Sequence, residues 1–200
     1  MSVSVLYMSM SLDGYIAGPN DRPGNPGGDG FMRLHKWYER ADGEFGRPDG
    51  PASAIWDELN ATGAVLVGRR TAEQVDYYGG EHHDGVPIFV LTHRVPDDPP
   101  PGTVRYVTDV TECAAQARAA AGDGDVMVHG AAAAQALLRA GQLDELELHV
   151  VPVLLGQGRR LFDHLPAEHV ELDLVRRLTT PDVADLAQRV THLRYRIRRS

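Results

Sequence analysis

The sequence predicts an α/β fold in which a mostly parallel sheet carries helices on both faces and ends in an antiparallel C-terminal hairpin. Between residues 64 and 140, short apolar runs alternate with helical segments, which is typical of parallel strands covered on both faces. After residue 145 the strand-like runs are longer, and no helix separates the last two. The chain also opens on a strand, because Val3–Met8 alternate and favour β geometry.

Length and composition indicate a single domain. We treat residues 1–200 as one unit, because 42% hydrophobic and 24% charged residues are typical of a globular domain and no repeat or linker divides the chain. The formal charge of −8 argues against nucleic acid as a main partner. No secretory signal is visible, and Asp13 interrupts the first apolar run, so we expect a cytoplasmic protein that does not enter a membrane. The lone cysteine, Cys113, excludes an intrachain disulfide and is interpreted as a small buried hydrophobe.

The first third of the chain contains a long loop rich in glycine and proline, Pro19–Gly30. Such a loop is long for a compact domain, which favours a functional role. We expect the wider segment from Gly18 to Gly50 to be mobile in the free protein and to order over a bound ligand. Two short helices are predicted at Phe31–Arg40 and Ala52–Ala61.

The remaining elements follow from the apolar pattern. Strands are predicted over 64–67, 87–91, 104–107, 125–128, 145–155, 170–178 and 190–197. Helices are predicted over 71–78, 110–121 and 131–140, and Gly141 ends the last of them. A turn at Pro181-Asp182 would join the last two strands as an antiparallel hairpin.

Three loops each follow a buried strand at its carboxyl end, where open α/β sheets bind ligands. They cover residues 65–71, 88–94 and 126–132. In the first, Gly68 permits close backbone approach and Thr71 can cap the next helix. In the third, Gly130 opens a helix whose free amides can hold an anion. Taken alone, each loop is better explained as an ordinary turn at Gly68, a helix packed closely on its strand at Gly130, or solvated arginines, but their joint occurrence in this order favours a ligand site.

The sequence resembles the dihydrofolate-reductase-like superfamily, in particular the reductase domain of the bifunctional riboflavin-biosynthesis deaminase-reductase and its stand-alone relatives. The matching segments span nearly the whole chain in the family's order: residues 8–17, 67–71, 91–94, 129–132 and 151–162. The first and the last of these are the most specific. The zinc-deaminase cysteines are absent, so only the reductase half is represented.

The resemblance implies an NADPH site. Arg69–Thr71 would lie at the adenosine, Thr92–Arg94 at its 2′-phosphate, and Gly130–Ala133 at the pyrophosphate. Met10 and Ile16-Ala17 would border the nicotinamide, and the loop at Gly156–Gly158 would support the first loop. The full set of expected cofactor-binding residues is Met10, Ile16, Ala17, Gly68, Arg69, Arg70, Thr71, Leu91, Thr92, His93, Arg94, His129, Gly130, Ala131, Ala132 and Ala133.

The implied function is transfer of hydride from NADPH to a small heterocyclic substrate, of pterin, pyrimidine or flavin type. The expected substrate-binding residues are Ser11, Trp37, Trp56 and Asp57, and a core role for Trp37 is an equal alternative. No catalytic side chain is identified. An alternative from another class is a non-catalytic nucleotide- or flavin-binding protein that retains the fold. The resemblance also suggests a homodimer formed through the C-terminal strands.

Two family acids are missing from this sequence. Dihydrofolate reductases place a carboxylate near the position of Ala52, where the nearest acids are Asp57 and Glu58. The riboflavin-type reductases carry an acid just before the pyrophosphate loop, where this chain has Val128-His129. Neither folate reduction nor riboflavin-pathway reduction is therefore assigned, and we expect poor dihydrofolate reductase activity and weak methotrexate binding.

Other polar groups are predicted to be structural. By similarity to the family, Asp13 fixes its own turn through backbone hydrogen bonds. The run Glu81–Asp84 lacks the spacing of a metal site and is interpreted as a solvated loop, so no metal is expected. The alternating arginines of the last strand are predicted to form the solvent face of an edge strand: Arg194, Arg196, Arg198 and Arg199.

Overall fold

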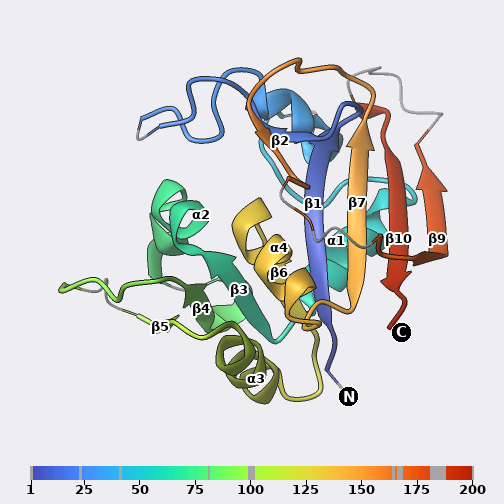
Figure 1. Cartoon of the computed structure of the whole chain (residues 1–200). Helices are drawn as coiled ribbons and strands as arrows, with labels where there is room; N and C mark the ends of the chain where they lie inside the picture. The colour runs from blue at the N-terminus through green and yellow to red at the C-terminus, as the bar shows by residue number, and fades with distance from the viewer. Residues whose placement is uncertain are drawn as a thin grey trace.

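A computed structural model describes residues 2–22, 24–40, 42–80, 82–98, 102–163, 165, 169–180 and 188–199. Eight strands form one sheet in the order β5-β4-β3-β6-β1-β7-β10-β9 (Figure 1). The parallel strands are β1 (Ser4–Ser11), β3 (Ala64–Gly68), β4 (Ile88–Leu91), β5 (Val104–Val107), β6 (Val126–His129) and β7 (Glu145–Val151). The antiparallel pair at one edge is β10 (Thr191–Ile197) and β9 (Leu172–Thr179). The predicted fold is confirmed, whereas the Pro181-Asp182 turn lies outside the described residues.

Helices cover both faces of the sheet, as predicted. One face packs against α3 (Val110–Ala121) and α4 (Ala131–Arg139), and the other carries α1 (Ala52–Asn60) and α2 (Arg69–Gln74). Strand alternation explains this arrangement, since Leu66 joins the core under α3 and α4 while its neighbours Val65 and Val67 join the opposite core. Cys113 is fully buried in the first of these cores, also as predicted.

A small second sheet pairs β2 (Tyr15–Ala17) with β8 (Arg159–Arg160), so the first loop and the loop after β7 lie side by side. The Asp13 carboxylate accepts the backbone N–H groups of Leu155 at 3.1 Å and Gly156 at 2.8 Å. These bonds, with that from Ser11, lower the pKa of Asp13. Asp13 therefore has a structural role. Its carboxylate contacts its own turn through the Ser11 hydroxyl, while the backbone N–H groups that it accepts belong to the distant loop after β7.

The predicted helix at Phe31–Arg40 is wrong in type. The segment forms two 3₁₀ helices, η1 (Phe31–Leu34) and η2 (Lys36–Tyr38). The 3₁₀ turn has three residues, so Leu34 and Trp37 lie on the same side, and both are buried in one core cluster with α1. The 3₁₀ conformation is therefore favoured over an α-helix because it buries both of these side chains.

The helix after β3 begins two residues earlier than predicted. Its N-cap position is occupied by Gly68, so Thr71 lies in the first turn and does not cap the helix. The helix ends at Gln74 because left-handed backbone follows, with φ between 47° and 53° from Asp76 to Tyr78. Two short turns that contain left-handed residues continue the chain, η3 (Asp76–Gly80) and η4 (His83–Gly85).

The terminal arginines correct another prediction, because the sheet edge is β9 and not β10. Arg194 is only 14% exposed and pairs with Glu145 at 2.7 Å and Glu58 at 2.9 Å. Strand alternation places the Arg194 side chain on the face covered by α1, beside these two acids. Arg196, Arg198 and Arg199 are 63%, 59% and 62% exposed, so these three do face solvent as predicted.

Candidate functional site

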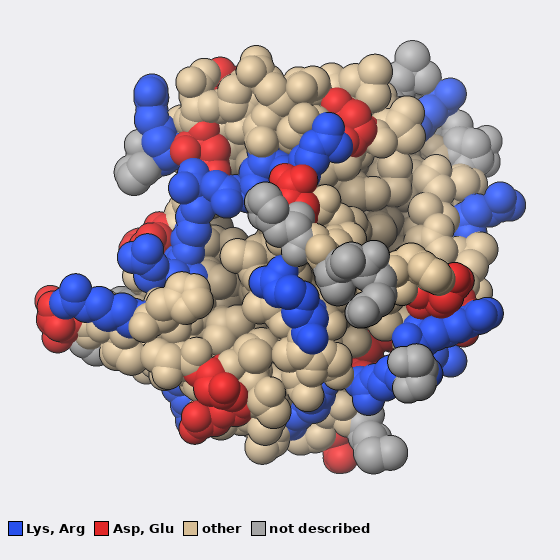
Figure 2. Space-filling view, viewed as in Figure 1, with Lys and Arg blue, Asp and Glu red and all other residues tan. Residues whose placement is uncertain are grey.

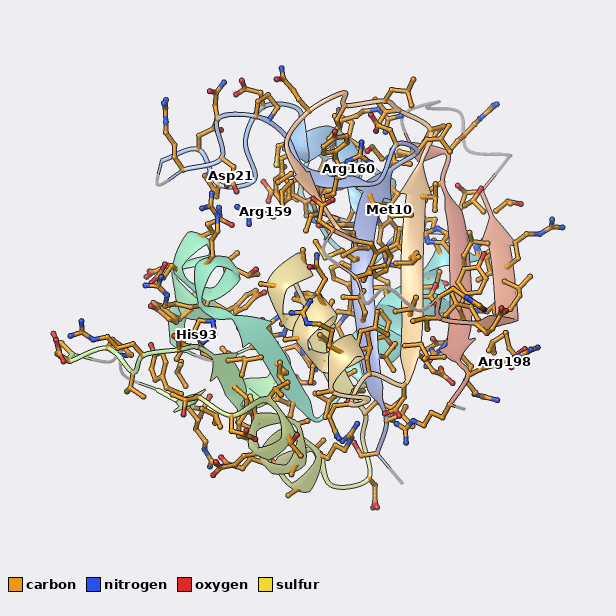
Figure 3. All side chains as sticks on the ribbon, in the orientation of Figure 1. Met10, Asp21, His93, Arg159, Arg160 and Arg198 are labelled. Atoms are coloured by element: carbon orange, nitrogen blue, oxygen red, sulfur yellow. The ribbon has the colours of Figure 1, made fainter. Side chains whose placement is uncertain are left out.

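The candidate site lies where β1 and β6 separate. In β1, only residues Ser4–Leu6 pair with β6. The same strand stays paired with β7 as far as Ser11. Met10 lies on the part of β1 beyond the separation (Figure 3). Ile16 and Ala17 are buried in the adjacent strand β2. Figure 2 shows the surface hollowed between these parts of the molecule, with basic side chains around the opening.

The loops after β3 and β6 touch each other at this hollow. Gly130 has a φ of +85°, and a Cβ placed on it would lie 2.3 Å from the Thr71 Oγ1. A Cβ on Gly68 would lie 3.6 Å from the backbone nitrogen of Ala133. No side chain caps the first turn of α4, which consists of small residues, Ala131–Ala133. Because the first amides of a helix have no intrahelical partner, this turn can receive an anionic group.

A cavity of about 640 Å³ lies beside these loops, at the carboxyl ends of β4 and β5. Four of the residues predicted to bind cofactor line it: Leu91, Thr92, His93 and Ala132. The Thr92 hydroxyl donates to the Arg94 carbonyl at 2.9 Å and accepts the Arg94 N–H at 3.3 Å, which fixes the turn. This volume falls in the range of small-molecule sites.

Two of the predicted phosphate-binding arginines share a second hollow of about 280 Å³. Arg69 pairs with Glu73 at 3.3 Å, and Arg94 pairs with Asp97 at 2.9 Å. All four side chains are exposed, so each pair contributes little and can be exchanged for a ligand phosphate.

Arg70, the third predicted arginine, is engaged by Asp21 from the glycine-rich loop. Its Nη2 donates to Oδ2 of Asp21 and to the Asp21 carbonyl, both at 2.9 Å. Arg159 approaches the same carboxylate oxygen at 3.4 Å, and Gln74 hydrogen-bonds the other oxygen (Figure 3 labels Asp21 and Arg159). The Asp21 side chain is 8% exposed, whereas the Arg70 side chain is 51% exposed, so the carboxylate is covered and the arginine remains accessible to solvent. Sequence reasoning missed the connection, since no local pattern signals a contact between residues 49 positions apart.

His129, just before Gly130, forms a further polar contact at this edge. The Tyr78 hydroxyl lies 3.2 Å from His129 Nδ1. Burial, with a smaller contribution from His82, lowers the pKa of His129 to about 3, so the imidazole is neutral at physiological pH. Burial also lowers the pKa of His82 to about 4, and His82 stands 2.6 Å from His83 between their Nδ1 atoms. This pair is half-buried, so the predicted fully solvated loop is wrong here.

The four predicted substrate residues are not brought together. The Ser11 hydroxyl donates to Asp13 at 2.5 Å and accepts the Tyr15 N–H at 2.9 Å, so it serves the turn. Trp37 is a core residue, 6% exposed, whose indole N–H donates to Ser9 Oγ at 3.0 Å. Trp56 is half-buried on α1 and contacts Tyr38. Asp57 is exposed and forms an ion pair with Arg47 at 2.7 Å.

Comparison with known proteins places this chain in a family. The sequence matches the RibD C-terminal domain family over residues 4–184. The chain belongs to this family. A search of proteins with curated descriptions returned no match.

Two solved structures have the same fold. One is a protein from Shewanella sp. PV-4 with the provisional name riboflavin biosynthesis protein, at a TM-score of 0.72 and 19% identity, covering 98% of this chain and 99% of that one. The other is dihydrofolate reductase from Enterococcus faecalis, complexed with NADP(H) and RAB-propyl, at a TM-score of 0.61 and 16% identity, covering 99% and 97%. The RibD C-terminal domain chain thus has a dihydrofolate-reductase-like fold, which together with the family match supports a reductase-type role. Among its described helices, none is both long and apolar enough to cross a membrane.

Proposed function

We propose that this protein is an NADPH-dependent reductase that transfers hydride to a small heterocyclic substrate. The observation that carries the proposal is the contact between the loops after β3 and β6, beside two hollows that the loop after β4 shares with one or the other of them. The family match and the expected order of these loops along the chain support the same function. The chain has residues that could hold each part of a dinucleotide: the adenosine, the 2′-phosphate, the pyrophosphate and the nicotinamide.

Different groups of residues would bind the different parts of the cofactor, according to their charge and size. The cavity at Leu91–His93 would take the adenosine, and the hollow between Arg69 and Arg94 would take its 2′-phosphate. The amides of Ala131–Ala133 would bind the pyrophosphate, because small side chains let the phosphates approach the helix end. The nicotinamide end would lie by Met10, where β1 and β6 separate.

NADPH, when bound, supplies the hydride, and the protein's part is alignment and exclusion of water. The buried strand β2 and the loop held by Asp13 would close one side of the site. The Asp21 contact to Arg70 would hold the glycine-rich loop across the opening. His129 is neutral, so it presents a hydrogen-bonding imidazole and not a cation beside the cofactor.

The geometry of α1 argues against a pterin substrate. Asp57 is directed to solvent with Arg47, and both oxygens of Glu58 are held by Arg176 and Arg194. No acid on α1 is therefore free to hold a pterin ring, in keeping with the expected poor dihydrofolate turnover and weak methotrexate binding. A pyrimidine- or flavin-type acceptor is favoured.

The test is NADPH oxidation followed by the loss of nicotinamide absorbance, with dihydrofolate, flavins, pterins, pyrimidines and quinones as acceptors. Oxidation that depends on one acceptor class supports the reductase. Cofactor or flavin binding in calorimetry, without oxidation by any acceptor, would support the non-catalytic binding protein instead. Absence of NADPH binding would overturn both the cofactor and the reaction.

We also propose that two copies associate through the C-terminal strands. Strand β9 is the sheet edge, and its Leu172, Leu174 and Val175 are 38%, 57% and 47% exposed. An apolar edge strand is a natural site of pairing. Light scattering should give twice the chain mass of 21.8 kDa, and Leu174→Arg should reduce it to that of one chain. A monomer in the unmodified protein would contradict the proposal.

A further inference from the structure

Three side chains suited to bind a metal ion come together away from the cofactor loops. They are Glu147 and His149 on β7 and His192 on β10. His149 and His192 are direct cross-strand partners, and Glu147 lies two residues before His149 on the same face of β7. One ligand atom from each lies within 4.8 Å of the other two.

All three side chains are buried, with 0% exposure for Glu147, 3% for His149 and 1% for His192. The two Nδ1 atoms of the histidines lie 2.9 Å apart, so one hydrogen is shared between them.

Two polar atoms of this cluster have no hydrogen-bond partner among the residues that the structure describes. They are Oε1 of Glu147 and Nε2 of His192, each inaccessible to solvent. Neither tautomer of His192 corrects this, because a protonated Nε2 lacks an acceptor and a bare Nε2 lacks a donor. Leaving such atoms buried and unpaired destabilises the folded protein. A species bound between them would remove the cost.

The outer contacts of the cluster also fit a metal site. Arg176 holds the other oxygen of Glu147 at 2.9 Å, and ligating carboxylates usually have such an outer hydrogen bond. Its positive charge is compensated in turn by Glu58, which it also contacts. The Trp37 ring lies 4.6 Å from the His149 ring and 4.9 Å from the His192 ring, and so covers both ligands.

We propose that Glu147, His149 and His192 bind a divalent transition-metal ion such as Zn²⁺. Two imidazole nitrogens and one carboxylate oxygen form a donor set that suits zinc, cobalt and iron and disfavours magnesium and calcium. Because the ligands are buried under Trp37, the ion is structural and joins β7 to β10. It is independent of the cofactor site, so NADPH binding does not depend on it.

The experiment titrates the chelator-treated full chain with Zn²⁺ in calorimetry and with Co²⁺ in absorption and fluorescence. We expect one ion per chain, a visible Co²⁺ ligand-field band, a rise in Tm and quenching of Trp37 emission by Co²⁺. His192→Ala should weaken binding by about a hundredfold or more, since loss of an outer partner alone costs about ten- to a hundredfold. Glu147→Gln should weaken metal binding to a similar extent. It replaces His192→Ala in the experiment if that variant fails to fold.

The control is His169→Ala. The His169 imidazole is 88% exposed and lies 3.4 Å from the carboxylate of Glu171, which is also exposed. The variant should bind both metals like the unmodified chain. Binding that survives His192→Ala or Glu147→Gln, or is lost in His169→Ala, would overturn the assignment. So would absence of Zn²⁺ and Co²⁺ binding, in which case a water molecule satisfies Glu147 and His192.

Discussion

Gly130 and Thr71 are packed so closely that no side chain fits on Gly130, since a Cβ there would lie 2.3 Å from Thr71 Oγ1. The contact joins the loops after β3 and β6 and thus fixes the first turn of α4. Replacing Gly130 by alanine should therefore displace this turn and weaken NADPH binding by at least about tenfold, measured by calorimetry. Both the clash and the left-handed backbone, with φ at +85°, oppose the substitution.

The matched control for this prediction is Gly122→Ala. Gly122 also has a positive φ, +61°, and lies outside the three loops and the Gly18–Gly50 segment, and nothing lies within 4 Å of its added Cβ. It should carry the same backbone strain and leave NADPH affinity unchanged. Adding Thr71→Ala to Gly130→Ala should recover part of the affinity. Equal losses in both glycine variants would show that the loop contact is irrelevant.

The Asp21 contact predicts how the glycine-rich loop moves. Asp21→Asn keeps the shape of the side chain but removes its charge toward Arg70 and Arg159. Loss of a pair worth about 1 kcal/mol should speed hydrogen exchange of residues 18–22 and 24–30 by about fivefold. Asp29→Asn is the control, because Asp29 binds Asn20 and Asn25 within the same loop. Similar exchange in both variants would refute a special role for Asp21.

The depressed pKa of His129 predicts a loss of stability in acid. Above pH 6.5 the imidazole is neutral in the folded and unfolded states, so it adds no pH dependence. As the pH falls below 6.5, the unfolded chain binds a proton that the folded chain does not bind until about pH 3. By pH 5 this should lower the free energy of unfolding by about 1–2 kcal/mol, less where water reaches the half-buried ring.

Urea unfolding at several pH values measures this effect. His129→Asn should flatten the profile between pH 6.5 and 5, whereas substitution of the exposed His93 should not. An unchanged slope in His129→Asn would mean that the buried state of this ring has little influence on stability.

The sequence was most informative where local pattern and packing agree. Val104–Val107 and Val110–Ala121 were predicted to the residue, because a short run of β-branched and aromatic residues and an alanine-rich helix have clear local signals. The segment around Trp37 was predicted as one helix, since its two 3₁₀ turns depend on what Leu34 and Trp37 pack against. The three loops of the candidate site were predicted from their place at strand ends, but the contact from Asp21 was not predicted. Its contacts, like the Glu147–His192 cluster, depend on tertiary geometry.

We propose that the protein recognises NADPH by its 2′-phosphate. Paired calorimetric titrations of NADPH and NADH at low salt measure this recognition. Each arginine contact to the phosphate should contribute about 1.5–3 kcal/mol, or roughly ten- to a hundredfold in affinity. Arg69→Ala should raise the NADPH Kd at least about tenfold and barely alter that of NADH. Arg198→Ala, at the far end of the sheet in Figure 3, should change neither.

Added salt should reduce the preference by screening the arginines. The unmodified protein should bind NADPH at least about tenfold more tightly than NADH. Equal affinities for the two cofactors would contradict it.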